Sequence, residues 1–167
     1  LGQPVGARSV IGRGHRDLHA AAVQGQAQAF AADVRDLPAL GEAGRRCMAA
    51  QGVPDVVIAN AGISVGFDTA DADDLEVMRA SLETNLLGMA ATFQPFVGPM
   101  CERRSGTLVG ISSVNGIRGL PGAEAYSASK AAAIAYLESL RLEMRPYGIK
   151  VVTIAPGYIE TPMTAVN

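Results

Sequence analysis

Short apolar runs alternate along this chain with longer segments in which apolar residues recur at helical spacing. The runs that predict strands are 7–12, 27–32, 54–62, 106–113 and 149–157. The segments that predict helices are 15–23, 36–52, 73–104 and 124–145. The strands are apolar throughout instead of alternating, which is typical of a parallel sheet covered on both faces. We therefore predict an α/β fold with a doubly wound parallel sheet.

Polar and glycine residues interrupt the apolar runs at three strand ends, namely NAG at 60–62, ISS at 111–113 and APG at 155–157. Ligands of such sheets bind beyond the carboxyl ends of the strands, so we predict a site there. Pro95 and Pro99 lie inside the longest helical segment and are expected to kink or divide it. No repeat, low-complexity tract or linker interrupts residues 1–167, which predicts a single domain.

The composition excludes several classes of function. The 167 residues carry a formal net charge of −2, and no basic patch suggests nucleic acid. No apolar run approaches the length of a membrane span and no secretory signal opens the chain, so we expect a cytoplasmic protein without a membrane partner. Cys47 and Cys101 stand alone, which predicts unpaired thiols. His15 and His19 have zinc-ligand spacing but no third ligand, so we predict a solvated helix face and no metal.

Tyr126 and Lys130 lie four residues apart at the start of the last helical segment, so their side chains face the same way. One interpretation is a surface helix with an ordinary polar stripe. The other is an acid–base pair, because a neighbouring ammonium lowers the pKa of a phenol. The pair by itself does not decide between them.

A series of motifs in one order favours the second interpretation. The series consists of NAG at 60–62, Asn85 in LETNLLG, Ser113 at the end of VGISS, Tyr126 and Lys130 in YxxxK, and PGYIET at 156–161. It resembles the short-chain dehydrogenase/reductase (SDR) family over about residues 6–161. The resemblance implies a Rossmann-like fold. It also implies NAD(P)-dependent oxidation of a secondary alcohol, or the reverse reduction of a ketone or aldehyde.

The resemblance implies four catalytic roles. Tyr126 would exchange a proton with the substrate oxygen, and Lys130 would lower the tyrosine pKa and hold the nicotinamide ribose. Ser113 would donate a hydrogen bond to the substrate oxygen, and Asn85 would hold a water that links Lys130 to solvent. Structural alternatives remain open, because a serine after a strand often caps the next turn and a helical asparagine can bond a neighbouring backbone.

The resemblance also implies cofactor contacts. Asp33 would lie near the adenine ring, although an N-cap for the next helix is the alternative. The turn at Asn60, Ala61 and Gly62 would pass close to the adenosine ribose, where larger side chains would clash. The residues expected beside the nicotinamide are Pro156, Gly157, Ile159 and Thr161.

The second strand of the family ends in an acid when NAD is preferred, and here Arg13 occupies that region. A guanidinium suits a 2′-phosphate, which predicts NADP, with NAD still possible. Arg16 would share this role if the alignment shifts.

The chain departs from the family pattern at the phosphate-binding turn TGxxxGxG, which is missing. The GRG at Gly12–Gly14 is the nearest imitation, but Asp17 takes the place of the third glycine, so we reject it. The first strand would lie at the centre of such a sheet, and without it two strands lose a hydrogen-bonding partner. We therefore expect these residues to be part of a longer polypeptide, with an intact mass above 17.3 kDa.

The missing turn leaves a second hypothesis, a non-catalytic relative that kept the fold for binding or assembly. A different α/β nucleotide-binding module would not explain Tyr126 with Lys130. Residues 114–122 and 64–67 are expected to border the substrate, which would be a neutral or apolar ketone or an acyl-carrier thioester. The segments 73–104 and 124–145 are expected to form a homodimer or homotetramer.

Overall fold

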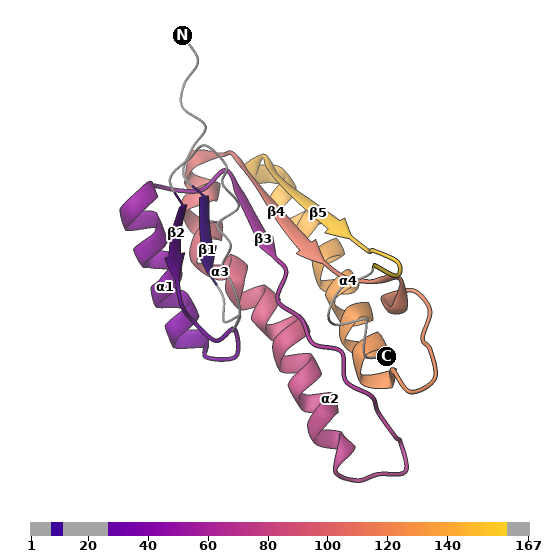
Figure 1. Ribbon diagram of the computed structural model, residues 1–167. Coiled ribbons are helices and arrows are strands. Elements are labelled where there is room, and N and C mark those ends of the chain that lie inside the picture. The colour runs from indigo at the N-terminus through magenta and orange to yellow at the C-terminus, as the bar shows by residue number, and fades with distance from the viewer. Residues whose placement is uncertain (1–7, 12–26, 160–167) are drawn as a thin grey trace.

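The computed structural model describes residues 8–11 and 27–159, and all structural statements below refer to these residues. Strands and helices alternate as predicted, in the arrangement that Figure 1 shows. The strands are β1 (Arg8–Ile11), β2 (Ala27–Phe30), β3 (Val56–Ala59), β4 (Gly106–Ile111) and β5 (Ile149–Ile154). The longer helices are α1 (Leu37–Gln51), α2 (Asp74–Leu82), α3 (Gly88–Arg103) and α4 (Glu124–Met144). The helix predicted at 15–23 lies outside the described residues.

The strands are parallel and form two sheets, one of β1 and β2 and one in the order β3–β4–β5. Ala59 lies beside Gly110, and Ile111 lies beside Ile154, so the carboxyl ends of β3, β4 and β5 share one edge. In the described part of the chain, β1 and β3 each pair on one side only. The predicted parallel sheet is confirmed, and among the described residues it is divided between β1 and β3, where the resemblance implies one further strand.

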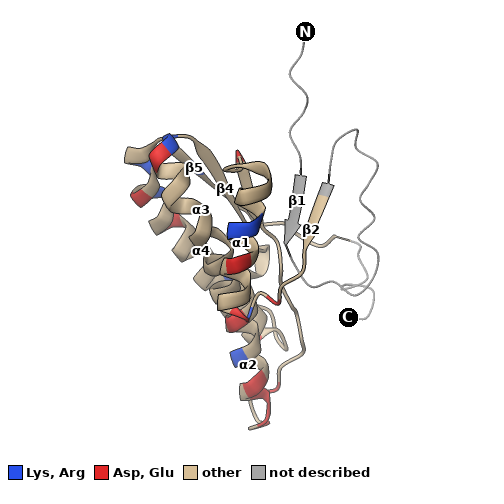
Figure 2. Ribbon diagram, turned by 90° about the vertical axis from the view of Figure 1, so that its left-hand side faces the viewer, with Lys and Arg blue, Asp and Glu red and all other residues tan. Residues whose placement is uncertain are grey.

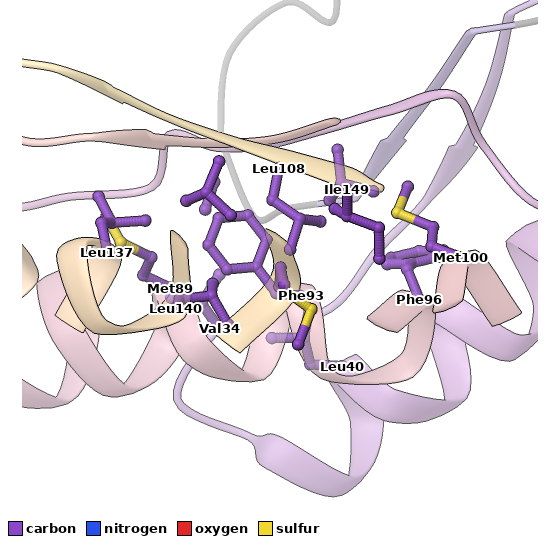
Figure 3. Packing of buried hydrophobic residues seen from close by; sticks show 14 of the residues in the cluster. Val34, Leu40, Met89, Phe93, Phe96, Met100, Leu108, Leu137, Leu140 and Ile149 are labelled. Atoms are coloured by element: carbon purple, nitrogen blue, oxygen red, sulfur yellow. The ribbon is translucent and has the colours of Figure 1, made fainter. Parts of the chain in front are cut away.

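The helices α1, α3 and α4 pack on one face of the strands, as Figure 2 shows. Their buried side chains meet those of the sheet in one apolar cluster, and its burial is the main contribution to the stability of the fold. Figure 3 shows Leu108 and Ile149 extending from the strands toward the helix layer, where Phe93 and Phe96 lie. This core fixes α4 against the strands, and α4 carries Tyr126 and Lys130.

The opposite face of the sheet carries no helix among residues 8–11 and 27–159. On β3, Val56 and Ile58 are 52% and 58% exposed, whereas Val57 and Ala59 are buried on the helix side. Val152 and Ile154 of β5 are exposed in the same alternating way. The second helix layer predicted from the sequence is therefore not part of the described structure.

The segment 73–104 is helical, but a π turn (Glu83–Leu87) separates α2 from α3. Pro95 and Pro99 lie inside α3, which continues through both. The prolines therefore do not divide this segment, whose α geometry is interrupted at the π turn instead, and the alternative expectation that they kink it stays a prediction. The Pro95 ring lies against α1, since a Cβ built at Gly44 would be 2.5 Å from Pro95 Cγ. We attribute the tolerance of Pro95 to this packing, which offsets the lost backbone hydrogen bond.

Candidate active site

The ends of β4 and β5 remain joined beyond the sheet itself. The backbone N–H of Ser112 donates to the carbonyl of Ile154 at 2.7 Å, and that of Val114 donates to Pro156 at 3.0 Å. Ser113 lies between these two contacts, so it is held beside the segment that follows β5. The ISS and APG motifs therefore lie side by side at the carboxyl edge of the sheet, as predicted.

Tyr126 and Lys130 occupy the first two turns of α4, and Lys130 Nζ lies 5.7 Å from the centre of the Tyr126 ring. Lys130 is only 3% exposed, and its Nζ donates a 2.8 Å hydrogen bond to the carbonyl of Ile111 at the end of β4. A buried lysine is incompatible with the interpretation of this pair as an ordinary surface stripe. The pair instead faces the strand ends.

Burial lowers the pKa of Lys130 from its ordinary value of 10.5 to about 8. Below that pH the side chain is a buried cation beside the Tyr126 ring. An ammonium has three N–H donors, and the Ile111 carbonyl takes one of them. Two donors are therefore available to a ligand with hydroxyl or anionic oxygens.

Ser113 is buried and is the second residue after the end of β4. Its Oγ accepts a 3.2 Å hydrogen bond from the backbone N–H of Asn115 and caps the 3₁₀ turn η2 (Val114–Gly116). The alternative expectation of a capping serine is thus confirmed. It does not exclude the catalytic role, because the hydroxyl accepts this bond and its own proton can still be donated.

Asn85 lies in the π turn and is 0% exposed. Its Oδ1 accepts from the backbone N–H of Ile63 at 2.8 Å, and its Nδ2 donates to the Ile63 carbonyl at 2.9 Å. Nδ2 also donates to the Oγ of Ser129 at 2.9 Å. Both N–H groups are therefore in use, so a water would have to bind the second lone pair of Oδ1 or the backbone. The predicted water relay remains a prediction.

Gly62, in the NAG turn, lies close to Asn85 and Lys130. A Cβ built at Gly62 would lie 3.3 Å from Asn85 Oδ1 and 3.4 Å from Lys130 Nζ. Side chains of the protein itself therefore restrict this position, in addition to the cofactor ribose invoked from the sequence. Asn60 and Ala61 are exposed, at the mouth of the same turn.

Asp33 follows β2 and organises the turn before α1. Its carboxylate accepts from the backbone N–H of Arg35 at 3.0 Å and pairs with the Arg35 guanidinium at 3.2 Å. The N-cap of α1 is Asp36, whose Oδ1 accepts from the N–H of Ala39 at 3.0 Å. The alternative interpretation of Asp33 as the N-cap is therefore wrong, by three residues.

The segment after β5 contributes Pro156, through its carbonyl, and the exposed residues Gly157 and Ile159. Arg13, Arg16 and Thr161 lie outside the described residues. The positions predicted for the 2′-phosphate, and one of those predicted for the nicotinamide, are thus without a structural description.

Three site residues escape prediction from the sequence. Ser112 is buried and donates from Oγ to the carbonyl of Lys130 at 2.9 Å. Gly116 lets η2 touch α4, since a Cβ built there would lie 2.7 Å from the Lys130 carbonyl carbon. Ser129 bonds Asn85, as above. The small residues in ISS, VNG and YSASK are the signal, but their partners are 14 to 44 residues away in sequence.

Among the described residues, no group of three or more His, Cys, Asp or Glu side chains is arranged to hold a metal ion. His15 and His19 lie outside them. The described helices also include none with the length and apolar character needed to cross a membrane.

Comparison with known proteins places these features in a family. A sequence model described as "short chain dehydrogenase" matches residues 6–167. An uncharacterized oxidoreductase of Myxococcus xanthus (strain DK1622) is 44% identical over 113 residues, which are 68% of this chain and 44% of the relative. An acetoacetyl-CoA reductase of Synechocystis sp. is 38% identical over 141 residues, or 83% of this chain and 58% of the relative. The chain thus spans about half the length of these relatives.

Solved structures agree with this assignment. The F189W actinorhodin polyketide ketoreductase with NADPH is similar over 95% of this chain and 63% of its own, with 33% identity and a TM-score of 0.87. An NAD+-bound xylitol dehydrogenase is similar over 83% of this chain and 53% of its own, with 28% identity and a TM-score of 0.77. With the YxxxK pair, Ser113 and the NAG turn at one sheet edge, the chain belongs to the short-chain dehydrogenase family.

Proposed function

We propose that this chain carries the catalytic residues of an NAD(P)-dependent oxidoreductase that interconverts a carbonyl group and a secondary alcohol. The observation that carries this proposal is the buried Lys130 ammonium beside the Tyr126 ring at the carboxyl edge of a parallel sheet. Burial of a charge is costly for a fold, and it is typical of functional sites.

The chemistry assigns one task to each side chain. Tyr126 gives its phenolic proton to the carbonyl oxygen during reduction and takes it back during oxidation. The Lys130 cation lies beside the Tyr126 ring, and its remaining N–H groups would hold the nicotinamide ribose. Ser113 donates its free proton to the same substrate oxygen and stabilises the charge that develops there. Asn85 holds the NAG turn in place and stays our candidate for the water relay to solvent.

The residues present fit the nicotinamide end of a dinucleotide. Gly62 has no side chain, so the space beside Lys130 Nζ stays open. Two N–H groups of Lys130 can donate hydrogen bonds to the hydroxyls of a ribose. When bound, the dinucleotide supplies or accepts the hydride. The residues proposed to hold it are Arg13, Asp33, Asn60, Ala61, Gly62, Tyr126, Lys130, Pro156, Gly157, Ile159 and Thr161.

NADP is the proposed cofactor, with NAD as the alternative. The proposal is supported by the guanidinium of Arg13 in the sequence and by the NADPH that the polyketide ketoreductase binds. The NAD+ of the xylitol dehydrogenase shows that relatives of this fold use both. Charge reversal in Arg13→Glu is expected to weaken NADPH binding and leave NADH binding nearly unchanged.

The substrate is proposed to be a neutral ketone or a keto group carried on an acyl thioester. The loop Val114–Gly122 is mostly small and apolar, with Arg118 as its charged residue, which suits an uncharged substrate. The acyl thioester is supported by the name of the acetoacetyl-CoA reductase, because acetoacetyl-CoA is a thioester.

The first test is binding of NADPH and NADH, with the intact mass recorded on the same sample, followed by turnover with acetoacetyl-CoA and with cyclohexanone. We expect tighter binding of NADPH, and a loss of turnover of at least about 100-fold in Tyr126→Phe. Tyr147→Phe is the matched control, because this exposed tyrosine follows α4 in the 3₁₀ turn η3 (Arg145–Tyr147). A folded protein that binds neither cofactor would instead support the non-catalytic relative.

We also propose that the chain is one partial domain of a cytoplasmic homodimer or homotetramer. Ala90, Ala91 and Gly98 of α3 and Leu140 of α4 line an open groove into which a second copy could pack. The buried thiol of Cys47 and the half-buried thiol of Cys101 are unpaired, which suits a reducing compartment. Light scattering on the protein and on Gly98→Arg tests the assembly, and a monomer in both samples would contradict it.

A further inference from the structure

A bridge of buried polar groups connects the π turn to α4 between the two proposed catalytic residues. Asn85 and Ser129 are both 0% exposed. Asn85 Nδ2 donates to Ser129 Oγ at 2.9 Å, and Ser129 Oγ donates to the Tyr126 carbonyl at 2.7 Å. The bridge therefore ends on the backbone of Tyr126, and Ser129 itself lies one residue before Lys130 in the chain.

The Ser129 hydroxyl has a defined direction in this bridge. It accepts from a carboxamide that has no other free N–H, since the second one is bound to the Ile63 carbonyl at 2.9 Å. Its own proton goes to the Tyr126 carbonyl. Because donor and acceptor are both fixed, neither side chain can rotate without leaving a buried polar group unpaired.

The same bridge reaches the other side of the site. Asn85 Oδ1 accepts from the N–H of Ile63, directly after Gly62. Oδ1 and Lys130 Nζ both border the position that a Cβ of Gly62 would take, at 3.3 Å and 3.4 Å. A displacement of Asn85 would therefore move the NAG turn. This turn borders the Lys130 ammonium, so the surroundings of the ammonium would change as well.

We propose that Ser129 is a positioning residue that acts through Asn85, locking the NAG turn to α4 so that Tyr126 and Lys130 hold their places. The assignment rests on the proposed function, since a positioning residue needs a reaction to serve. Ser129 itself touches neither substrate nor cofactor. Its removal is expected to act on the rate of the chemical step more than on substrate affinity.

The test is a double-mutant cycle of Ser129→Ala and Asn85→Ala in the full-length protein, assayed with NADPH and whichever of acetoacetyl-CoA and cyclohexanone it reduces. We expect Ser129→Ala to lower kcat by about 10- to 100-fold with KM changed by less than about threefold. We also expect the double variant to be no slower than Asn85→Ala alone, because both remove the same bridge.

Ser139→Ala is the matched control, because Ser139 is an exposed serine on the same helix whose Oγ donates to the carbonyl of Ala135 at 3.1 Å. Should Ser129→Ala fail to fold, Ser129→Cys keeps the volume with a much weaker donor and is expected to show the same loss of kcat. Wild-type kcat in the folded serine variants, or additive losses in the cycle, would overturn the assignment alone. Absence of turnover in the wild type would overturn the proposed function and this assignment with it.

Discussion

Lys130 couples the stability of the protein to pH, because its pKa is lowered to about 8 in the folded state from 10.5. Between these values the unfolded state binds more protons, so stability rises with pH across this window. Below about pH 8 the buried charge costs stability in full. We expect Lys130→Met to be more stable than the wild type at pH 7 by about 1–3 kcal/mol, after the lost bond to Ile111 is counted.

The gain of Lys130→Met should shrink as the pH rises above about 8 and level off above pH 10.5, where the wild-type lysine becomes neutral in both states. Urea unfolding at pH 7, 8, 9 and 10 measures this difference. Lys150→Met on β5 is the control, because Lys150 is exposed and should show no such trend. A difference between Lys130→Met and the wild type that is the same at pH 7 and pH 10 would contradict the account.

Ser112 and Ser113 are adjacent and buried, but the structure gives them different tasks. Ser112 donates to the Lys130 carbonyl, so Ser112→Ala is expected to cost about 1 kcal/mol of stability. Ser113→Ala is expected to lower kcat by about 100-fold or more through loss of the proton offered to the substrate. Thermal unfolding and steady-state kinetics on both variants test this, and a larger kcat loss in Ser112→Ala would reverse the assignment.

The sequence shows a residue's task only when a motif carries it. The placement of Tyr126, Lys130, Ser113 and the NAG turn at one edge of the sheet was predictable because they form an ordered series, and their tasks stay proposals. Ser129 was not, because its partner Asn85 is 44 residues away, and a serine next to a lysine signals nothing by itself. The interpretation of Asp33 as an N-cap was wrong for a related reason. Asp33 and Asp36 are the same residue type, and only the backbone structure shows that Asp36 caps α1.

At the scale of elements, the contact between η2 and α4 sets the distance from Ser113 to Lys130. A Cβ at Gly116 would lie 2.7 Å from the Lys130 carbonyl carbon and 2.9 Å from the Ala131 nitrogen, and backbone atoms cannot move aside. We expect Gly116→Ala to destabilise the protein by about 1–3 kcal/mol and to lower turnover. Thermal unfolding and kinetics on the same sample measure both effects.

Gly41→Ala is the control for this prediction. Gly41 lies inside α1, and a Cβ there would meet only the end of the Arg45 side chain at 3.6 Å. Alanine is the better helix former, so this variant should gain about 0.5–1 kcal/mol. If Gly116→Ala is as stable as the wild type, η2 and α4 do not touch as described.

The strands and helices themselves were predictable because each has its own apolar pattern, and the described ones match within a few residues. The long helix was only partly predictable. Its prolines are a strong local signal, but tertiary packing of Pro95 on α1 overrides it. The π turn has no marker in LETNLLG. We attribute it to Asn85, whose bonds to Ile63 and Ser129 hold the helix out of α geometry.

At the scale of the whole molecule, the break in the sheet was predictable only from the family resemblance, because each strand looks normal by itself. Local pattern predicted the parallel strands, and the resemblance implied a strand between β1 and β3. Among the described residues the strands form two separate sheets, with one paired edge each on β1 and β3. Val56 and Ile58 of β3 are also exposed in the described structure, which the apolar pattern of this strand does not predict.

This break predicts unequal local stability. The strand β4 pairs on both sides and contributes the fully buried Leu108, whereas β1 and β2 form a two-stranded sheet, which is marginal without further support. We expect native-state hydrogen exchange in β2 to be faster than in β4 by about tenfold or more, through local opening. The central amides of β4 should exchange only by global unfolding. The measurement is made on the 167-residue chain, and equal protection of β2 and β4 there would contradict this expectation.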